Sequence, residues 1–507
     1  MNHNASLAAL NERIAAVNDV LNAVSVLTWD SRTMMPAGGA ETRGHQIATL
    51  TGIARDLLLA PETEKALEAA ERATDDLPEE SAERRLVTQT RRAVDHHRRV
   101  PASLIQDRAA LRTMAQAAWI EARAKSEFSI FSPYLERTLA LSRSYADCIG
   151  WSEHPYDAMV SIYEPGETAK SLKSLFGTLR SGLLPILAAA RSRPAPRSDF
   201  LFRDFSEEAQ KAFGLSMAQK LGYDLRRGRL DTTVHPFEVS FTRNDVRITT
   251  RYHRNYLPAS IFGTAHETGH GLYEQGVDPA YTRTTLATDL IGLYAVGGTS
   301  FGAHESQSRL LENHIVRSRT FWRLHFPELQ AQFPDQLGDV TAEEFYQGVT
   351  RVEPGFIRVE ADELTYDFHI MLRTEIECAL MDGSLAVSDL PSTWNAAVKR
   401  DLDLDVPSDA QGVLQDVHWS TGYIGSFPTY TIGNVMAAQL MDTFLTNDPT
   451  LKGAIEAGDY SALANKLQAG IWEHGRRFSR QELLVRETGR GLDPLPYLSY
   501  LKTKYAH

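Results

Sequence analysis

Cysteine is almost absent from this sequence, because Cys148 and Cys378 are the only two in 507 residues. Two thiols are too few for a disulfide framework or for a zinc site built from thiolates. We therefore expect two buried free thiols and a protein of the reduced cytoplasm.

A long apolar run is missing as well. Polar and charged residues interrupt every apolar stretch of the N-terminal sequence MNHNASLAALNERIAAVNDV, so neither a signal peptide nor a membrane span is expected. An excess of basic residues is also absent, since 53 Lys and Arg face 65 Asp and Glu, for a net charge of −12. This balance excludes a nucleic-acid-binding surface over the whole molecule, and we expect neither nucleic acid nor membrane as a partner.

The residues that are present suit a large helical protein. Hydrophobic residues make up 43% of the chain, which is enough for a globular core. Apolar residues recur at intervals of three or four along Leu7, Leu10, Ile14, Val17, Leu21 and Val24, which predicts an amphipathic helix. The same spacing predicts helices near residues 42–60, 80–98, 103–126, 168–192, 206–221, 306–325, 359–382 and 434–446. The predicted fold class is mainly α.

One stretch alternates with a period of two instead. Phe237, Val239 and Phe241 alternate with polar neighbours, a turn-forming sequence follows at 243–245, and Val246 and Ile248 resume the alternation. We expect a β-hairpin here, immediately upstream of the chemical motif, where the edge of a small sheet can hold an extended substrate.

The chemical motif is His266-Glu267-Thr268-Gly269-His270. A spacing of four places the two imidazoles on one face of a helix, where they can bind one metal ion. Glu267 lies beside them and can take a proton from a water on that ion. The alternative is a chance match, against which a suitable third ligand downstream would argue.

That third ligand should be a carboxylate or an imidazole on another helix. His304-Glu305 begins an amphipathic run, and Glu305 is the leading candidate. Glu274 is four residues after His270 and is expected to support the site or face solvent rather than bind the metal. His304 should point away from the metal if Glu305 points toward it, and a structural hydrogen-bonding role is the favoured interpretation of this imidazole.

Further motifs occur in order along nearly the whole chain. They are Trp29-Asp30 with Thr33-Met34-Met35-Pro36 and Gly38-Gly39, His235-Pro236-Phe237, DVRIT at 245–249, HETGH at 266–270, HESQSR at 304–309, RVEADE at 358–363, GVLQDVHW at 412–419 and LSYLKTKY at 498–505. With these motifs the sequence resembles the carboxypeptidase Taq family of metal-dependent carboxypeptidases.

The resemblance implies one catalytic domain over residues 1–507, with a helical part at about 1–200 and the metal and substrate site at about 230–430. It also implies a deep substrate groove, a small β-sheet beside the metal helix, a homodimer, and removal of single residues from peptide C-termini with broad preference. By position, His266, His270 and Glu305 become the metal ligands and Glu267 the general base.

Two residues nearer the C-terminus gain roles from the resemblance. Arg358 is similar to a family residue that holds the terminal carboxylate of the substrate, which the planar fork of a guanidinium matches. A structural ion pair with Glu360 or Asp362 is the alternative. His418 is similar to a family histidine near the reacting carbonyl, where an imidazole can stabilise the oxyanion; core packing is its alternative.

The hairpin and a late tyrosine segment complete the expected substrate side. His235 and Arg247 resemble the groove wall beyond the terminal residue, with ordinary sheet structure as the alternative. The family usually has a tyrosine immediately before FPTY, where this chain has Ser426. We therefore expect Tyr423 to supply the phenol and Tyr430 to contact substrate, with simple packing as the alternative for both.

A second departure from the family lies between the ligands. The interval from His270 to Glu305 is 35 residues, longer than the family usually shows, with apparent extra residues within 277–303. Since HESQSR is preserved, we expect the extra residues to loop out and leave the ligand geometry intact.

The expected enzyme is a cytoplasmic metallocarboxypeptidase with one divalent ion per subunit. Zinc is the expected metal, although two imidazoles and a carboxylate also suit cobalt or manganese. One alternative is an endopeptidase or oligopeptidase on the same scaffold. The other is a relative that binds peptides without hydrolysing them, against which the retained Glu267 argues.

Overall fold

Helix α1 (His3–Thr33) contains the apolar stripe with which the sequence begins. The computed structural model describes residues 3–506. Leu10, Ile14 and Val17 have no exposed surface, as the predicted amphipathic pattern requires. They join one apolar cluster with side chains of the next three helices, α2 (Ala40–Leu59), α3 (Pro61–Thr74) and α4 (Ala82–Arg99).

The described chain divides into two compact units, each built from segments that are distant in the sequence. Unit 1 contains the described residues up to Arg98 together with Pro196–Val349 and Met436–Leu492. Unit 2 contains Arg99–Ala195, Thr350–Val435 and the described residues from Asp493 onward. Helix α17 (Pro428–Asn447) contains the boundary between Val435 of unit 2 and Met436 of unit 1.

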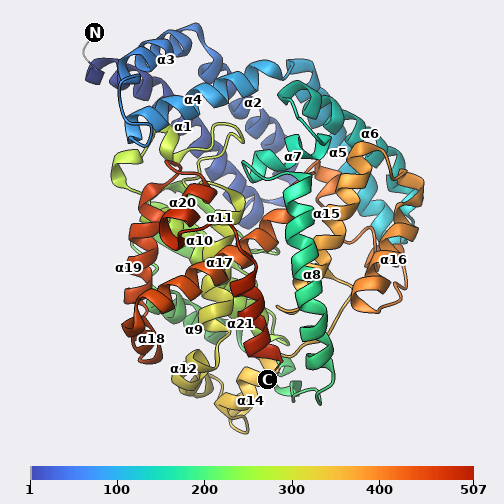
Figure 1. Ribbon diagram of the computed structural model, residues 1–507. Coiled ribbons are helices and arrows are strands. Elements are labelled where there is room, and N and C mark those ends of the chain that lie inside the picture. Colours follow the sequence, from blue (N-terminus) through green and yellow to red (C-terminus); the bar gives the residue numbers. More distant parts are fainter. Residues whose placement is uncertain (1–2, 507) are drawn as a thin grey trace. The chain divides into compact units, whose positions relative to one another are not determined.

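Unit 1 contains helices α1 to α4 and a second group of helices around α10 (Leu257–Gly276), as Figure 1 shows. Nearly every residue of α10 is buried, so this helix forms the centre of the unit. The other helices of the group are α9 (Glu207–Lys220), α11 (Phe301–Arg309), α12 (Arg319–Gln332), α13 (Pro334–Leu337), α14 (Ala342–Val349), α18 (Pro449–Glu456), α19 (Ser461–Gly470) and α20 (Arg480–Thr488).

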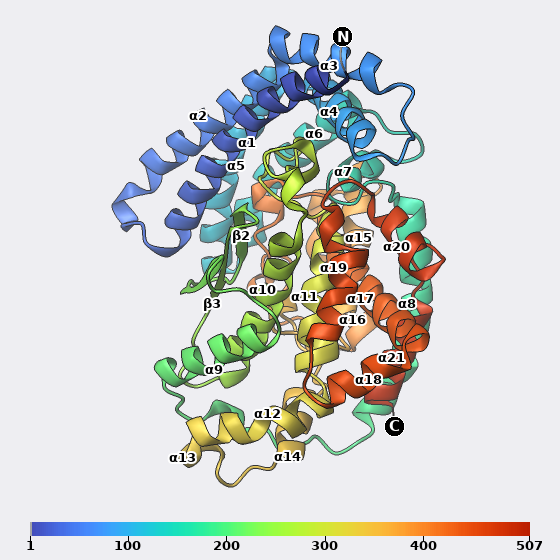
Figure 2. The same ribbon diagram turned by 90° about the vertical axis from the view of Figure 1, so that its left-hand side faces the viewer.

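A three-stranded sheet in the order β1-β3-β2 packs on α10, and Figure 2 shows β2 and β3 beside that helix. The predicted hairpin is present as β2 (Glu238–Thr242) and β3 (Asp245–Thr250), paired antiparallel. Strand β1 (Gly228–Thr232) pairs parallel with β3 and was not predicted. Val246 and Ile248 are fully buried, so the alternating pattern marks the face that packs inward.

Three predicted helices have different bounds in the structure. The one predicted at 434–446 is α17, which begins earlier, at Pro428. The run predicted at 306–325 comprises α11, a π-helix η5 (Leu310–Val316) and α12. Ser318 ends the run, because its side chain accepts the backbone N–H of Phe321 and caps a new helix. The helix predicted at 359–382 starts later, as α15 (Tyr366–Asp382), because the Asp362 carboxylate accepts the N–H groups of Leu364 and Thr365 in a turn.

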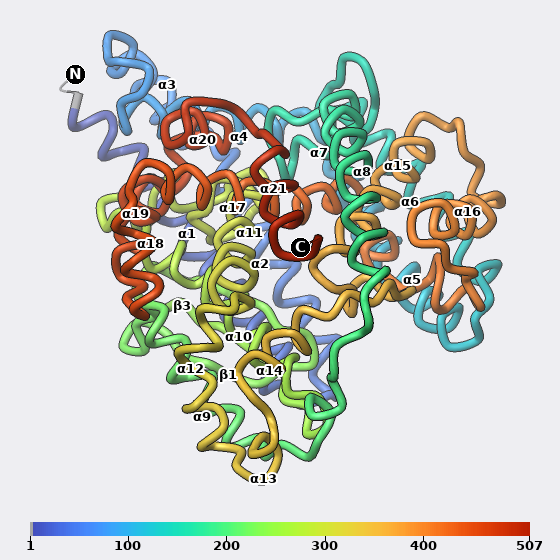
Figure 3. Tube along the Cα trace, turned by 60° about the horizontal axis from the view of Figure 1, so that its bottom comes forward, coloured from blue at the N-terminus to red at the C-terminus, as the bar shows by residue number. Residues whose placement is uncertain are grey.

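Helices are the only regular secondary structure among the described residues of unit 2, and its helices α5 and α6 lie side by side (Figure 3). Its helices are α5 (Ala102–Lys125), α6 (Phe128–Ile149), α7 (Pro155–Tyr163), α8 (Ala169–Arg191), α15, α16 (Leu390–Leu402), α21 (Leu495–Tyr505) and the first part of α17. The mainly α fold class predicted from the sequence is confirmed. Cys148 and Cys378 are free and only partly buried.

No helix among residues 3–506 combines the length and the apolar character that crossing a membrane would require.

Candidate active site

Helix α10 places both motif histidines at one point. Pro258 stands in its first turn, where a missing N–H does no harm, and the helix continues through the HETGH sequence. His266 and His270 are one turn apart, and their Nε2 atoms lie 3.2 Å from each other. Two ring nitrogens this close, each with a lone pair, point at a shared ligand position.

Helix α11 brings Glu305 to the same point. The helices cross so closely that a Cβ atom on Gly269 would lie 2.4 Å from the carbonyl oxygen of Gln307. Only glycine fits this contact. The Oε2 atom of Glu305 lies 3.6 Å from His266 Nε2 and 3.4 Å from His270 Nε2.

The three ligand atoms fit a divalent ion. Two ligands at 2.0–2.1 Å from a tetrahedral zinc ion are roughly 3.4 Å apart. The observed separations of 3.2, 3.4 and 3.6 Å bracket that value. Within residues 3–506, these side chains form the one group of His, Cys, Asp or Glu with three ligand atoms within 4.8 Å of one another.

The carboxylate of Glu305 is held in its charged form. Burial would raise its pKa, but Arg309 and the two imidazoles outweigh burial and hold the pKa well below the usual range. The Nε atom of Arg309 donates to Oε1 at 2.7 Å, which leaves Oε2 facing the histidines.

A second carboxylate, Glu312, supports His266 from behind. It lies on the π-helix η5, where its Oε2 atom is 2.9 Å from His266 Nδ1 and 3.3 Å from an Arg309 nitrogen. Arg317 donates to its other oxygen at 2.9 Å. Sequence reasoning missed Glu312, although its spacing of seven residues from Glu305 places the two on one helix face.

His304 does not point away from the ligands, so the expected direction is wrong, but it has the hydrogen-bonding contacts that the favoured interpretation requires. Its ring meets that of His270 with centroids 4.5 Å apart, and its Nε2 atom is 3.0 Å from Glu274. The segment 277–300 that precedes α11 leaves the three ligand atoms 3.2–3.6 Å from one another, as expected, but it does not loop out. It packs into the apolar cluster of α1 to α4 through Val277, Tyr281, Leu286, Leu290 and Ala295.

Glu267 is the charged residue of the motif that is not one of the three metal ligands. Its side chain is buried, and burial raises its pKa to about 7, against the opposing effect of His266. A carboxyl that titrates near neutrality suits proton transfer at physiological pH.

Comparison with known proteins agrees with this geometry. The family model of the carboxypeptidase Taq (M32) metallopeptidases matches residues 9–505. The chain belongs to this family. It is a metal-dependent carboxypeptidase, which is a peptide hydrolase, and the family implies a divalent metal ion.

Curated and solved M32 relatives match almost end to end. Carboxypeptidase 1 of Bacillus subtilis is 36% identical over 96% of this chain and 95% of its own length. Thermostable carboxypeptidase 1 of Thermus thermophilus is 38% identical over 95% and 94%. The solved M32 carboxypeptidase of Deinococcus radiodurans superimposes with a TM-score of 0.94 at 40% identity, over 99% of both chains.

Arg358 of this M32 enzyme lies in unit 2 and is buried in an ion-pair network. Its Nε and one terminal nitrogen are each 2.9 Å from one oxygen of Asp416, and Arg373 contacts the other oxygen at 2.6 Å. The partner carboxylate is thus Asp416 of the QDVHW motif, rather than Glu360 or Asp362.

His418 and Tyr430 are neighbours in the same unit. The Nε2 atom of His418 is 3.3 Å from the Tyr430 hydroxyl. Burial and the nearby Arg358 lower the pKa of His418 to about 3, so the ring is neutral at physiological pH. Tyr423 packs its ring 6.3 Å from that of Tyr163.

Sequence reasoning also missed the residue that holds this segment. Glu377 of α15 is fully buried and accepts hydrogen bonds from the Tyr156 hydroxyl at 2.8 Å and the Trp419 indole at 2.9 Å. It also accepts from the Gly425 amide at 3.0 Å. A glutamate followed directly by four apolar residues, as in ECALM at 377–381, is the signal that was available.

The two hairpin residues lie in unit 1. His235 is exposed in the segment before β2. Arg247 on β3 pairs with Asp245 at 2.8 Å and lies over the rings of Trp29 and Phe241. Their roles toward substrate stay predictions.

Proposed function

We propose that this M32 enzyme removes single residues from the C-termini of peptides with broad preference, using one divalent ion held by His266, His270 and Glu305. The observation that carries the proposal is the convergence of the three ligand atoms at 3.2–3.6 Å. Such spacing is what a small ion with three protein ligands and an open position requires.

Zinc is the proposed ion, with cobalt and manganese as the alternatives that this ligand set also suits. When bound, zinc lowers the pKa of a water to about 7 and polarises a carbonyl. Two neutral imidazoles and one carboxylate leave one positive charge uncompensated at the site, which favours stabilisation of an oxyanion.

Glu267 is the proposed general base. In this role it takes the proton of the attacking water and gives it to the leaving amine. Its pKa of about 7 in the buried site supports both steps, because the group then exchanges a proton readily at neutral pH.

Arg358 is proposed to hold the terminal carboxylate of the substrate. The guanidinium also contacts Asp416 and the Tyr366 hydroxyl, and these fix its orientation. His418 is proposed to stabilise the reacting carbonyl from its neutral form, with Tyr423 as the phenol donor.

The remaining substrate contacts are proposed from the family resemblance. Tyr430 is positioned by its contact with His418, and the hairpin residues His235 and Arg247 wall off the space beyond the terminal residue. A homodimer in the cytoplasm is proposed on the same ground. Light scattering of the purified protein tests the dimer, and a monomeric mass would reject it.

The test compares cleavage of a peptide with cleavage of its C-terminal amide. Mass spectrometry identifies the products formed by apo, zinc-loaded and cobalt-loaded protein. Stepwise loss of single C-terminal residues from the free acid alone is expected. Internal cuts in both peptides would instead favour an endopeptidase. Metal-dependent retention without product would favour a binding protein.

The matched variant is Glu267→Gln, which keeps the size of the side chain and removes its basicity. It should bind the ion and lose turnover by roughly 10²- to 10⁴-fold. Near-normal turnover would reject Glu267 as the base.

A further inference from the structure

The ring nitrogen of His270 that faces away from the ligand position meets a second imidazole. If Nε2 of His270 carries the lone pair that binds the ion, its proton must be on Nδ1. That Nδ1 atom is 2.5 Å from Nδ1 of His304. His304 must therefore accept with its own Nδ1 and carry its proton on Nε2.

The far side of His304 satisfies this requirement. Its Nε2 atom is 3.0 Å from Oε1 of Glu274, which accepts the proton's hydrogen bond. Burial would raise the pKa of Glu274, but His304 and two backbone amides outweigh it and keep the carboxylate charged. The three side chains thus form one chain of directional hydrogen bonds, from His270 through His304 to Glu274.

The His304 ring is closely surrounded. It contacts the rings of His270 and Tyr273, with centroids 4.5 Å and 5.4 Å away and interplanar angles of 24° and 20°. A Cβ atom on Gly298 would lie 2.4 Å from its Cδ2 atom. Glycine at 298 therefore lets the backbone close over the edge of the ring.

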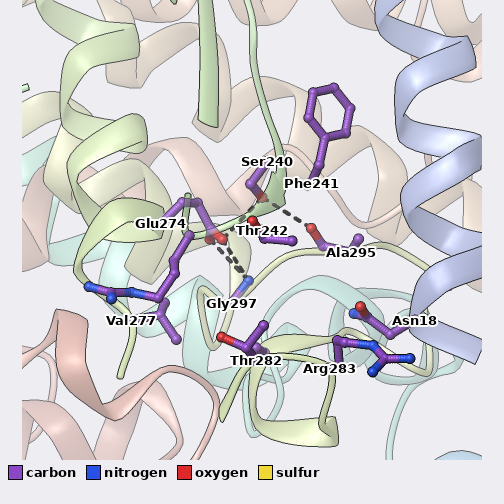
Figure 4. A pocket seen from close by; sticks show the side chains of 12 residues that line it. Asn18, Ser240, Phe241, Thr242, Glu274, Val277, Thr282, Arg283, Ala295 and Gly297 are labelled. Atoms are coloured by element: carbon purple, nitrogen blue, oxygen red, sulfur yellow. Dashed lines mark hydrogen bonds between the residues drawn. The ribbon is translucent and has the colours of Figure 1, made fainter. Parts of the chain in front are cut away.

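Glu274 is held by segment 277–300 and by strand β2. The amides of Gly297 and Gly298 donate to the carboxylate at 2.9 Å each, and Ser240 Oγ is 3.1 Å from it. Figure 4 shows this carboxylate facing Ser240 and Gly297 at the side of a pocket. The residue supports the metal ligand from the end of α10 that is farther from His266.

Segment 277–300 is itself fixed by the N-terminal helices. Asn18 of α1 donates to the Thr288 hydroxyl at 2.6 Å, and Thr90 of α4 is 2.6 Å from the Thr285 hydroxyl. The ring of His97 is 2.7 Å from the carbonyl of Leu290. These contacts give the two amides at 297 and 298 a fixed position.

We propose that His304 and Glu274 are positioning residues for the metal ligand His270, and that segment 277–300 supplies the amides that hold Glu274 in place. The proposal rests on the proposed metal site. On this proposal, the long interval between the ligands fixes the orientation of the His270 ring and the position of its proton.

The test is the affinity of the protein for zinc, measured by competition with a chromophoric chelator. His304→Ala removes the acceptor for His270 Nδ1–H and should weaken zinc binding roughly 10- to 100-fold. His325→Ala is the matched control, because that imidazole is also partly buried in unit 1 and its Nε2 atom is 2.8 Å from the Tyr460 hydroxyl, away from the proposed ligands. It should leave the affinity unchanged.

Two further variants keep the test open if His304→Ala folds poorly. Glu274→Gln preserves the size of the side chain, but its NH2 group would face one of the N–H groups that now donate to the carboxylate. It should weaken zinc binding several-fold. Gly298→Ala leaves both positioning side chains chemically intact and should weaken binding by displacing the His304 ring. The absorption spectrum of the cobalt-loaded protein should change in both, because the donor strength of His270 changes.

The outcomes separate the two proposals. If His266→Ala abolishes zinc binding while the three variants keep wild-type affinity and cobalt spectra, the positioning role is rejected and the metal site stands. If His266→Ala also retains full affinity, the metal site itself is rejected. The melting temperature of each apo protein distinguishes lost positioning, which leaves it near the wild-type value, from general unfolding, which would overturn the inference.

Discussion

Oε2 of Glu312 lies 2.9 Å from Nδ1 of His266, on the side of the ring opposite to the nitrogen that faces His270. The imidazole is thereby held between a carboxylate and the proposed ion. Arg309 contacts both Glu312 and Glu305, so it joins the support of one ligand to another ligand.

Glu312→Gln should weaken zinc binding roughly 10- to 100-fold, because the carboxylate fixes the tautomer of His266 and raises its basicity. Chelator competition measures the effect. Glu328→Gln is a control in unit 1, where the carboxylate pairs with Lys220 near the surface. Equal zinc affinities of the two variants would contradict the support that we assign to Glu312.

The fold and the ligand set were accessible from the sequence because both follow from local periodicity. Helices at 40–59, 102–125 and 169–191 begin and end within two residues of the predicted ranges. The motif HETGH lies on α10 as its spacing of four requires. A long amphipathic pattern or a short motif can be recognised from residues within a few helical turns of one another.

Contacts between distant segments were not accessible in this way. Strand β1 pairs with β3 in parallel, and no turn sequence between the two strands predicts a parallel pair. His304 was expected to turn away because it neighbours Glu305, yet adjacent helical positions differ by about 100°, which leaves room for one to bind and the other to support. The pairing of Arg358 with Asp416 spans 58 residues.

Gly269→Ala should destabilise unit 1 by about 1–3 kcal/mol or more, because helices α10 and α11 would have to separate. It should also weaken metal binding. A Cβ atom there would lie 2.5 Å from the Ser308 Cα atom as well as close to Gln307. Thermal unfolding of the apo protein and chelator competition measure the two effects.

Gly263→Ala on the same helix is the matched control. Its Cβ atom would meet the Thr250 hydroxyl at 3.6 Å, which is an ordinary contact. Alanine is also favoured over glycine within a helix by up to about 1 kcal/mol. A Gly269→Ala protein as stable as Gly263→Ala would show that the helix crossing tolerates a side chain.

Glu377 should make the stability of the protein fall as the pH rises from about 5 to about 7. Burial raises the pKa of this carboxyl to about 7 in the folded protein, above its ordinary value of 4.5. In that interval the unfolded chain has released the proton while the folded protein still binds it, so rising pH favours unfolding. The loss is at most about 3 kcal/mol from a shift of this size.

The melting temperature at several values between pH 5 and pH 7 measures this contribution. Glu377→Gln cannot ionise, so its melting temperature should change less over the same interval than that of the wild type. The variant should be less stable at pH 5, because one amide group cannot accept all of the hydrogen bonds from Tyr156, Trp419 and Gly425. Parallel pH profiles of the two proteins would exclude Glu377 as the source.

Arg358→Lys should reduce kcat/KM for peptides with a free C-terminal carboxylate by roughly 10- to 100-fold, because a lysine cannot pair with Asp416 and with a second carboxylate through one planar group. The comparison with C-terminally amidated peptides is decisive, since these lack the charge that Arg358 is proposed to bind. The ratio of the two kcat/KM values should fall toward one in the variant.

Arg351→Lys, which alters an ion pair with Glu353 in the same unit, should leave that ratio unchanged. If Arg358→Lys kept the wild-type preference for the free acid, the buried arginine would serve the structure around Asp416 and another group would read the peptide terminus.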